Sequence, residues 1–203
     1  DALAPGDKEA LSPLRQFAER EIIRARMLRN QCASLPNTGR TTIFLRDRLR
    51  IQSSICEGRV IKTIGLFGDM RTMDLVRKSM NGTSIENRAA ALEALDTIGD
   101  KQLAKNIVNL LEEEPKPSSP SVAIEALLQS EDIWMRTLAV CAIPELDLRE
   151  FIPVLHKLKA DPHELVQEAA LKSLSLFGEV KPMDTLKTVS IFERVHVIMC
   201  AFA

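Results

Sequence analysis

The chain has 203 residues, of which 45% are apolar, 27% are charged and only 4% are aromatic. These proportions are typical of a folded globular protein, and the few aromatic residues disfavour a β-sandwich, which depends on aromatic and β-branched side chains. The sequence contains no run of 18 apolar residues, so it predicts no membrane-spanning helix. A net charge of −1 conceals two regions of opposite charge.

The first predicted region, residues 1–56, consists of long basic helices. Residues 1–62 hold 12 Lys and Arg against 7 Asp and Glu, a net charge of +5, whereas the rest of the chain carries −6. A basic region of this kind can face phosphates, an anionic membrane surface, an acidic partner or only solvent. The arginines of its first helix are Arg15, Arg20, Arg24, Arg26 and Arg29.

Four later segments share one helical pattern, with matching residues at offsets 0, 3, 6, 7, 10 and 11 from starts at 57, 88, 136 and 167. This spacing follows one face of an α-helix. The Gly or Asp at offset 11 predicts a helix end that needs a positive φ. The positions at offsets 0 to 7 in the three clearest copies are Arg88, Ala91, Ala94 and Leu95, then Arg136, Ala139, Ala142 and Ile143, then Gln167, Ala170, Ser173 and Leu174.

The starts are separated by 31, 48 and 31 residues. A step of 31 residues holds two helices and two turns, the size of one α-solenoid unit. Small residues on the first helices would let neighbouring helices approach closely, and second helices are expected over 70–80, 101–114 and 148–160. We therefore expect one solenoid over residues 1–203. Its later parts are repeats one and two (57–114), a Pro/Ser linker with a short helix (115–130), repeats three and four (131–180) and a C-terminal helix (181–203).

The segments SEDIWMRTLAVCAI (130–143) and DPHELVQEAALKSL (161–174) resemble the HEAT repeat signature. In that signature an Asp-Pro turn precedes a helix that carries Val-Arg, then Ala, then Ala-Leu. The resemblance covers about 57–180 and implies an all-α fold, a right-handed α-solenoid of HEAT-like two-helix repeats. In HEAT proteins the arginine commonly bonds to the turn of an adjacent unit. The resemblance implies such a link at Arg88 and Arg136, and its weakening or loss at Gln167.

The order of the segments along the chain resembles that in a narrower group of HEAT-repeat proteins. The long helix TIFLRDRLRIQSSICEGRVIKTIGLF, the acidic Pro/Ser break and the closing segment TVSIFERVHVIMCAFA resemble the HEAT region of bacterial proteins with an ADP/ATP carrier-like membrane domain. A cyclic-nucleotide-binding domain often follows in those proteins. The resemblance implies that this chain is the connecting cytoplasmic solenoid, with neither transport nor nucleotide chemistry. The first residue is not Met and the last segment is apolar, so we expect a piece of a longer protein.

The sequence predicts no catalytic, cofactor or metal site. His163-Glu164 is the one His-Glu pair, whereas HEAT-repeat hydroxylases use several such pairs to hold two irons. The four cysteines form no CxxC and lie at no metal-ligand spacing from a histidine, so we expect reduced core thiols. Basic residues without interleaved aromatic residues disfavour nucleic-acid binding.

We expect a non-enzymatic protein-interaction or regulatory module that couples to adjoining domains of the same chain or to another protein, close to a membrane. The alternative is a free-standing soluble HEAT scaffold. In either case the candidate interaction surface consists of basic positions on the second helices, whose ordinary role is solvated charge: Arg77, Lys78, Lys101, Lys105 and Lys157. The sequence shows no small-molecule site.

Overall fold

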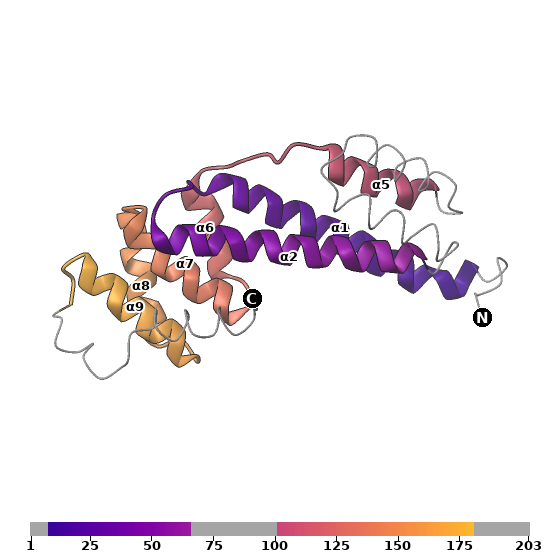
Figure 1. Ribbon diagram of the computed structural model, residues 1–203. Helices are drawn as coiled ribbons and strands as arrows, with labels where there is room; N and C mark the ends of the chain where they lie inside the picture. The colour runs from indigo at the N-terminus through magenta and orange to yellow at the C-terminus, as the bar shows by residue number, and fades with distance from the viewer. Residues whose placement is uncertain (1–7, 66–100, 181–203) are drawn as a thin grey trace. The chain divides into compact units, whose positions relative to one another are not determined.

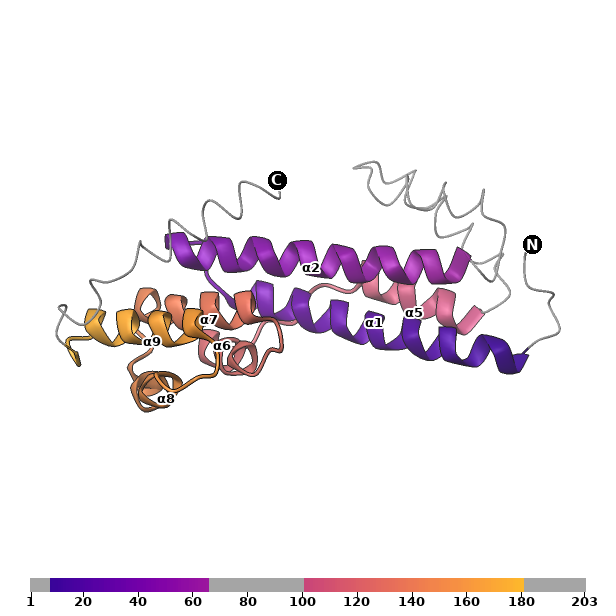
Figure 2. The same ribbon diagram turned by 90° about the horizontal axis from the view of Figure 1, so that it is seen from below.

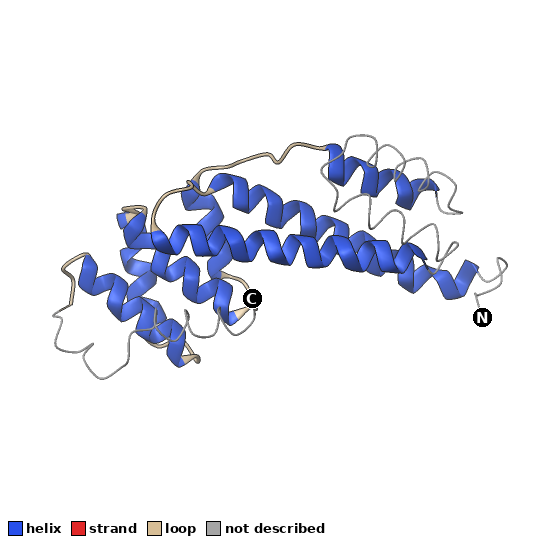
Figure 3. Ribbon diagram, in the orientation of Figure 1, coloured by secondary structure: helices blue, strands red, loops and turns tan. Residues whose placement is uncertain are grey.

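The computed structural model describes residues 8–65 and 101–180, and every element in these two ranges is helical, without a strand (Figure 3). The all-α class predicted from the sequence is therefore confirmed for this part of the chain. The predicted second helix over 70–80, the first helix of the repeat that starts at 88 and the C-terminal helix over 181–203 lie outside the described residues. So do six of the predicted positions: Arg77, Lys78, Arg88, Ala91, Ala94 and Leu95. The second helix predicted over 101–114 is present as a helix over Lys101–Glu112.

The backbone contacts divide the chain into two compact units. Unit 1 comprises Asp1–Ala33 and Leu49–Pro117, and unit 2 comprises Ser34–Arg48 and Ser118–Ala203. Each unit buries its own set of apolar side chains, such as Ile22 and Val60 in unit 1 and Ile143 and Leu174 in unit 2.

Unit 1 contains α1 (Lys8–Ser34) up to Ala33, the later part of α2 (Arg40–Gly65) and α5 (Lys101–Glu112), as Figure 1 shows. The predicted boundary between 56 and 57 falls inside α2, which runs through it without a break. A single glycine at Gly58 destabilises a helix by only about 1 kcal/mol, and no proline follows it, so nothing local ends the helix there.

Within unit 1, α1 and α2 lie side by side and antiparallel in both views (Figure 1, Figure 2). The hydroxyl of Ser53 donates to the buried carbonyl of Ala25 at 3.4 Å, and the guanidinium of Arg59 lies 3.3 Å from the carboxylate of Glu21. The main apolar side chains buried in these two helices are Ala18, Ile22, Ala25, Leu28, Leu49, Cys56 and Val60. Polar pairs thus fix the register of two helices whose contact is otherwise apolar.

Unit 2 contains α6 (Pro120–Leu128), α7 (Ile133–Glu145), the short 3-10 helix η1 (Arg149–Phe151), α8 (Ile152–Leu158) and α9 (Glu164–Leu176). The helix α7 packs against both α6 and α9, and α8 packs against α9 (Figure 2). Side chains cap the N-termini of two of these helices: Ser119 accepts from the amide of Val122, and Asp132 accepts from two amides in the first turn of α7.

The predicted second helix over 148–160 is shorter in the structure. It starts as η1 and becomes the regular helix α8 only at Ile152. Pro153 suits a helix start at Ile152, because proline has no amide hydrogen to donate and the first turn of a helix does not need one.

The small residues of the predicted repeats lie in the centre of unit 2. Ala139, Ala142, Ile143, Ala170 and Leu174 each expose 0% of their surface. Alanines at such a contact allow two helix backbones to approach closely, and the larger Ile143 and Leu174 fill the space beside them. Among the described residues, no helix is both long enough and apolar enough to cross a bilayer.

Candidate functional site

The helices α7 and α9 end in the same way, 31 residues apart. The residue after each C-cap has a positive φ, 50° at Asp147 and 79° at Gly178. Its amide donates three residues back, and the next amide donates five residues back, from Leu148 to Ile143 and from Glu179 to Leu174. These are two Schellman motifs, which satisfy carbonyl groups left open at a helix end. The prediction of a positive φ at offset 11 is confirmed at both positions.

Arg136 links α7 to the turn that leads into α9. One terminal nitrogen of its guanidinium lies 2.7 Å from each carboxylate oxygen of Asp161. The pair is mostly shielded, with 18% of the arginine side chain and 9% of the aspartate side chain exposed. The same carboxylate accepts from the amide of His163 at 2.9 Å. One aspartate therefore fixes the turn before α9 and binds α7.

Gln167 occupies the position of Arg136 in the next copy of the pattern. Its side-chain amide donates to the backbone carbonyl of Asp161, in the turn that precedes its own helix. Beyond these contacts, the hydroxyl of Ser173 donates to the carbonyl of Val140 at 3.0 Å across the buried face between α9 and α7. Three of the predicted repeat positions thus carry specific polar contacts within unit 2.

Both ends of α7 are also bound by the first turns of α2, within unit 2. Near the N-terminus of α7, the guanidinium of Arg48 lies 3.2 Å from the N-cap carboxylate of Asp132. Near its C-terminus, the carboxylate of Glu145 accepts from the amides of Thr41 and Thr42 at 2.8 and 2.9 Å. Glu145 thereby satisfies two amides at the N-terminus of α2, where a negative charge is favourable.

This contact lowers the pKa of the Glu145 carboxyl group. Burial raises its pKa, but the hydrogen bonds from Thr41 and Thr42 outweigh that effect, and the pKa is lowered from 4.5. Gly39 lies against the same carboxylate with a φ of 80°, and a Cβ placed there would be 2.6 Å from Oε2. The backbone angle favours glycine here, and a larger residue would also displace the Glu145 carboxylate.

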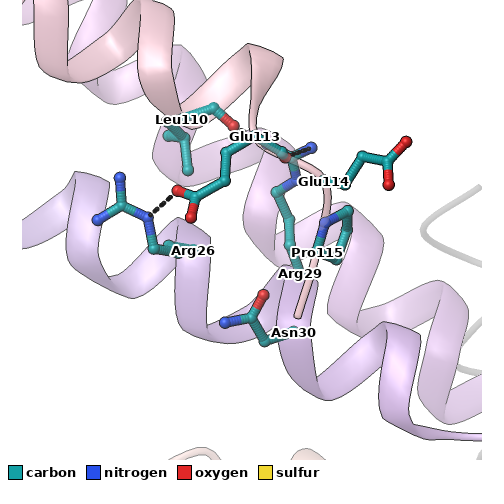
Figure 4. Close-up of a pocket in the computed structure, with 7 residues that line it drawn as sticks. All are labelled: Arg26, Arg29, Asn30, Leu110, Glu113, Glu114 and Pro115. Atoms are coloured by element: carbon teal, nitrogen blue, oxygen red, sulfur yellow. Dashed lines mark hydrogen bonds and ion pairs between the residues drawn. The ribbon is translucent and has the colours of Figure 1, made fainter. Parts of the chain in front are cut away.

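A shallow pocket lies in unit 1 between α1 and the end of α5 (Figure 4). Its space of about 170 Å³, part of which is open solvent, is below the ~300–1,000 Å³ of ligand sites. Arg29 donates to the carbonyls of Leu110 and Glu113, while Nε of Arg26 lies 3.1 Å from the Glu113 carboxylate. The ammonium of Lys116 and then the guanidinium of Arg26 lower the pKa of Glu113. The lining groups therefore hold α5 in place.

The predicted basic surface is divided between the units. Lys105 is exposed on α5 in unit 1 and Lys157 is exposed on α8 in unit 2, while Lys101 is the first residue of α5. The pair His163-Glu164 is exposed at the start of α9. Residues 8–65 and 101–180 contain no group of three or more His, Cys, Asp and Glu side chains able to hold a metal ion.

The cysteines in the described ranges, Cys32, Cys56 and Cys141, form no disulfide, and they are buried as predicted. Burial is the main cause that raises the pKa of Cys56 to about 11 and that of Cys141 to about 12. Thiols with such values are weak nucleophiles near neutral pH. They serve as small apolar groups of the core.

One surface was missed in the sequence, namely the outer face of α1. Ile23 and Met27 are 64% and 48% exposed there, beside the exposed arginines Arg20 and Arg24. The signal was the spacing of Ile23 and Met27 on the face opposite the buried residues Ala18, Ala25 and Cys32.

Comparison of the chain with protein-family models, curated proteins and solved structures gave no match.

Proposed function

We propose that the chain is a non-enzymatic protein-interaction and regulatory module, built as a right-handed α-solenoid of HEAT-like two-helix repeats. The observation that carries this proposal is the pair formed by Arg136 and Asp161. It joins the first helix of one predicted repeat to the turn of the next, which is the link that the HEAT resemblance implies. The equivalent helix ends at Asp147 and Gly178, one repeat length apart, give independent support.

The finer proposal is that this solenoid is the cytoplasmic segment of a membrane protein that resembles nucleotide-exchange transporters. There it would connect the membrane domain to a cyclic-nucleotide-binding domain. Each unit of a solenoid contacts only its neighbours, so small rotations between units add up along the array. A basic first region suits a segment that follows a membrane domain on its cytoplasmic side.

The test of the finer proposal is the coding sequence on both sides of the segment. Upstream codons for a series of apolar spans of about 20 residues, with a Gly-rich β-domain encoded downstream, would support it. A reading frame that starts near Asp1 and stops near Ala203 would contradict it. The second candidate, a free-standing HEAT scaffold, would then take its place.

The coupling itself has a separate test. The protein with its neighbouring domains is examined by amide hydrogen exchange, with and without cyclic AMP. We expect cyclic AMP to change exchange in α7 and in the turn around Asp161, because a signal that passes along the array must alter contacts between units. Binding of cyclic AMP with no change of exchange anywhere in 101–180 would contradict a coupling role.

A further inference from the structure

The arginines of α1 serve different purposes, which the sequence alone did not separate. Arg26 and Arg29 are directed to α5, and Arg15 pairs with Glu19 at 3.2 Å on the same helix. Arg20 and Arg24 are exposed on another face of α1. These last two arginines are the ones placed to meet something outside the chain.

The exposed arginines share this face of α1 with two exposed apolar residues. Ile23 is 64% exposed and Met27, one turn further on, is 48% exposed. Gln16, Arg20, Ile23 and Met27 are separated by four, three and four residues, and all four are exposed. Steps of three and four residues form the straight seam along which one helix packs against another. This face therefore has the geometry that receives a helix.

The positive charge on this face of α1 favours one kind of partner helix. Arg20 lies on the seam and Arg24 lies directly beside it, so a helix on this face would bring its own flanking side chains close to both guanidinium groups. Carboxylates at those positions would form ion pairs, whereas basic residues would be repelled. The best complement is a helix with apolar residues at its centre and acidic residues along its edges.

Two other occupants fit less well. A second copy of α1 would place Arg20 and Arg24 against the same two arginines of the other molecule. Helices that lie on membranes usually insert large apolar or aromatic residues such as Trp, Phe and Leu. The strongly exposed apolar residues of α1 and α2 over 12–63 are Ile and Met only.

We propose that the outer face of α1, formed by Gln16, Arg20, Ile23, Arg24 and Met27, is the docking site for an acidic amphipathic helix of a protein partner. The proposal rests on the proposed function and names the surface and the partner chemistry for it.

The test uses the full 203-residue chain and a fluorescein-labelled synthetic peptide of four heptads. The peptide has Leu at the a and d positions and Glu at e and g, where like charges oppose its self-association. A second peptide carries Lys in place of each of these glutamates. Binding is followed by fluorescence anisotropy, and circular dichroism checks the fold of each variant.

We expect the acidic peptide to bind the wild-type chain and the basic peptide not to bind it. The double variant Arg20→Glu, Arg24→Glu should lose about tenfold or more in affinity for the acidic peptide and gain binding of the basic one. The variant Ile23→Ser, Met27→Ser should weaken binding of the acidic peptide. The matched control, Lys62→Glu with Lys159→Glu, makes the same change of charge at exposed residues outside α1 and should bind the acidic peptide as the wild type does.

Three results would overturn the proposal. The first is that the acidic peptide does not bind, or binds both double variants of α1 as well as it binds the wild type. The second is that phosphatidylserine-containing vesicles bind the chain instead and are released by Arg20→Glu, Arg24→Glu, which would assign the face to lipid. The third is a dimer in sedimentation that Ile23→Ser, Met27→Ser dissociates, which would assign the face to a second copy. None of these results changes the outcome of reading the flanking codons, so the two proposals fail separately.

Discussion

The contact between α7 and α9 in unit 2 and the contact between α1 and α2 in unit 1 are built in different ways. Ala139, Ala170 and Leu174 make the first contact with no exposed surface, and one hydroxyl, that of Ser173, crosses it. The second contact buries the carboxylate of Glu21 and the hydroxyl of Ser53. A repeated apolar face reveals the first kind of contact in a sequence, while the second kind depends on single polar pairs that no periodicity marks.

The difference also concerns what fixes the register of the helices. Small residues at regular spacing allow close approach but would tolerate a slip by one turn, so the link from Arg136 to Asp161 adds specificity in unit 2. In unit 1 the pairing of Glu21 with Arg59 sets the register directly. The stability of unit 2 should therefore depend most on side-chain volume, and the stability of unit 1 should depend most on its polar pairs.

The largest expected effect is on the apolar contact of unit 2. Leu174→Ala should lower the free energy of unfolding by about 2–5 kcal/mol, because it leaves a cavity at a site with 0% exposure. Leu176→Ala, on the same helix but 68% exposed, is the matched control and should change it by less than about 0.5 kcal/mol. Urea unfolding measures both, and equal losses would show that α9 does not bury the assigned face.

Added volume should harm the same contact. Ala139→Leu places a larger side chain where two helices meet, and should lower the free energy of unfolding by about 1–3 kcal/mol. The control is Ala126→Leu on the exposed face of α6, where space is available. If thermal unfolding of Ala139→Leu matched the wild type, the proposed packing of α7 would be wrong.

In unit 1 the two members of the polar pair should respond unequally. The side chain of Glu21 is 9% exposed and that of Arg59 is 51% exposed. Arg59→Leu should cost about 1–3 kcal/mol, because it leaves a buried carboxylate without its cation. Glu21→Leu should cost less than about 1 kcal/mol, since the arginine can remain in water and an apolar residue suits the site. Chemical denaturation of both variants shows which one loses more free energy of unfolding. A larger loss for Glu21→Leu would show that the unpaired carboxylate is not the costly group.

A smaller effect depends on pH and concerns Glu145. Its pKa is lowered from 4.5 in the folded chain, so its ionised form adds stability above that value, and this stability is lost as pH falls through the folded pKa. Glu145→Gln should lower the free energy of unfolding by about 0.5–1 kcal/mol at pH 7. The difference from the wild type should persist down to pH 5 and shrink below about pH 4.5. A difference that grows in acid would contradict the role of the carboxylate.

The sequence predicted the main helices of unit 2 from the regular spacing of their small and apolar residues. It also marked two helix ends, at Asp147 and Gly178. The predicted boundary after Cys56 has no such signal, and α2 continues across it. A residue that tolerates a positive φ thus located the ends of α7 and α9.

Contacts between distant residues could not be read in this way. Glu145 binds amides more than 100 residues earlier, at Thr41 and Thr42, and Arg29 binds the end of α5. An exposed carboxylate or arginine has the same local pattern whether it meets solvent or a distant helix end. For the same reason the sequence did not separate Arg20 and Arg24 from the other arginines of α1.

We propose that Arg136 and Asp161 link α7 to the turn before α9 as parts of adjacent repeats. A double-mutant cycle with Arg136→Gln and Asp161→Asn measures that link, because asparagine can still accept from the amide of His163. We predict a coupling energy of at least about 1 kcal/mol, against nearly zero for the exposed pair of Arg149 and Asp147, whose side chains are 67% and 74% exposed. Additive single effects at Arg136 and Asp161, within about 0.3 kcal/mol, would contradict the claim.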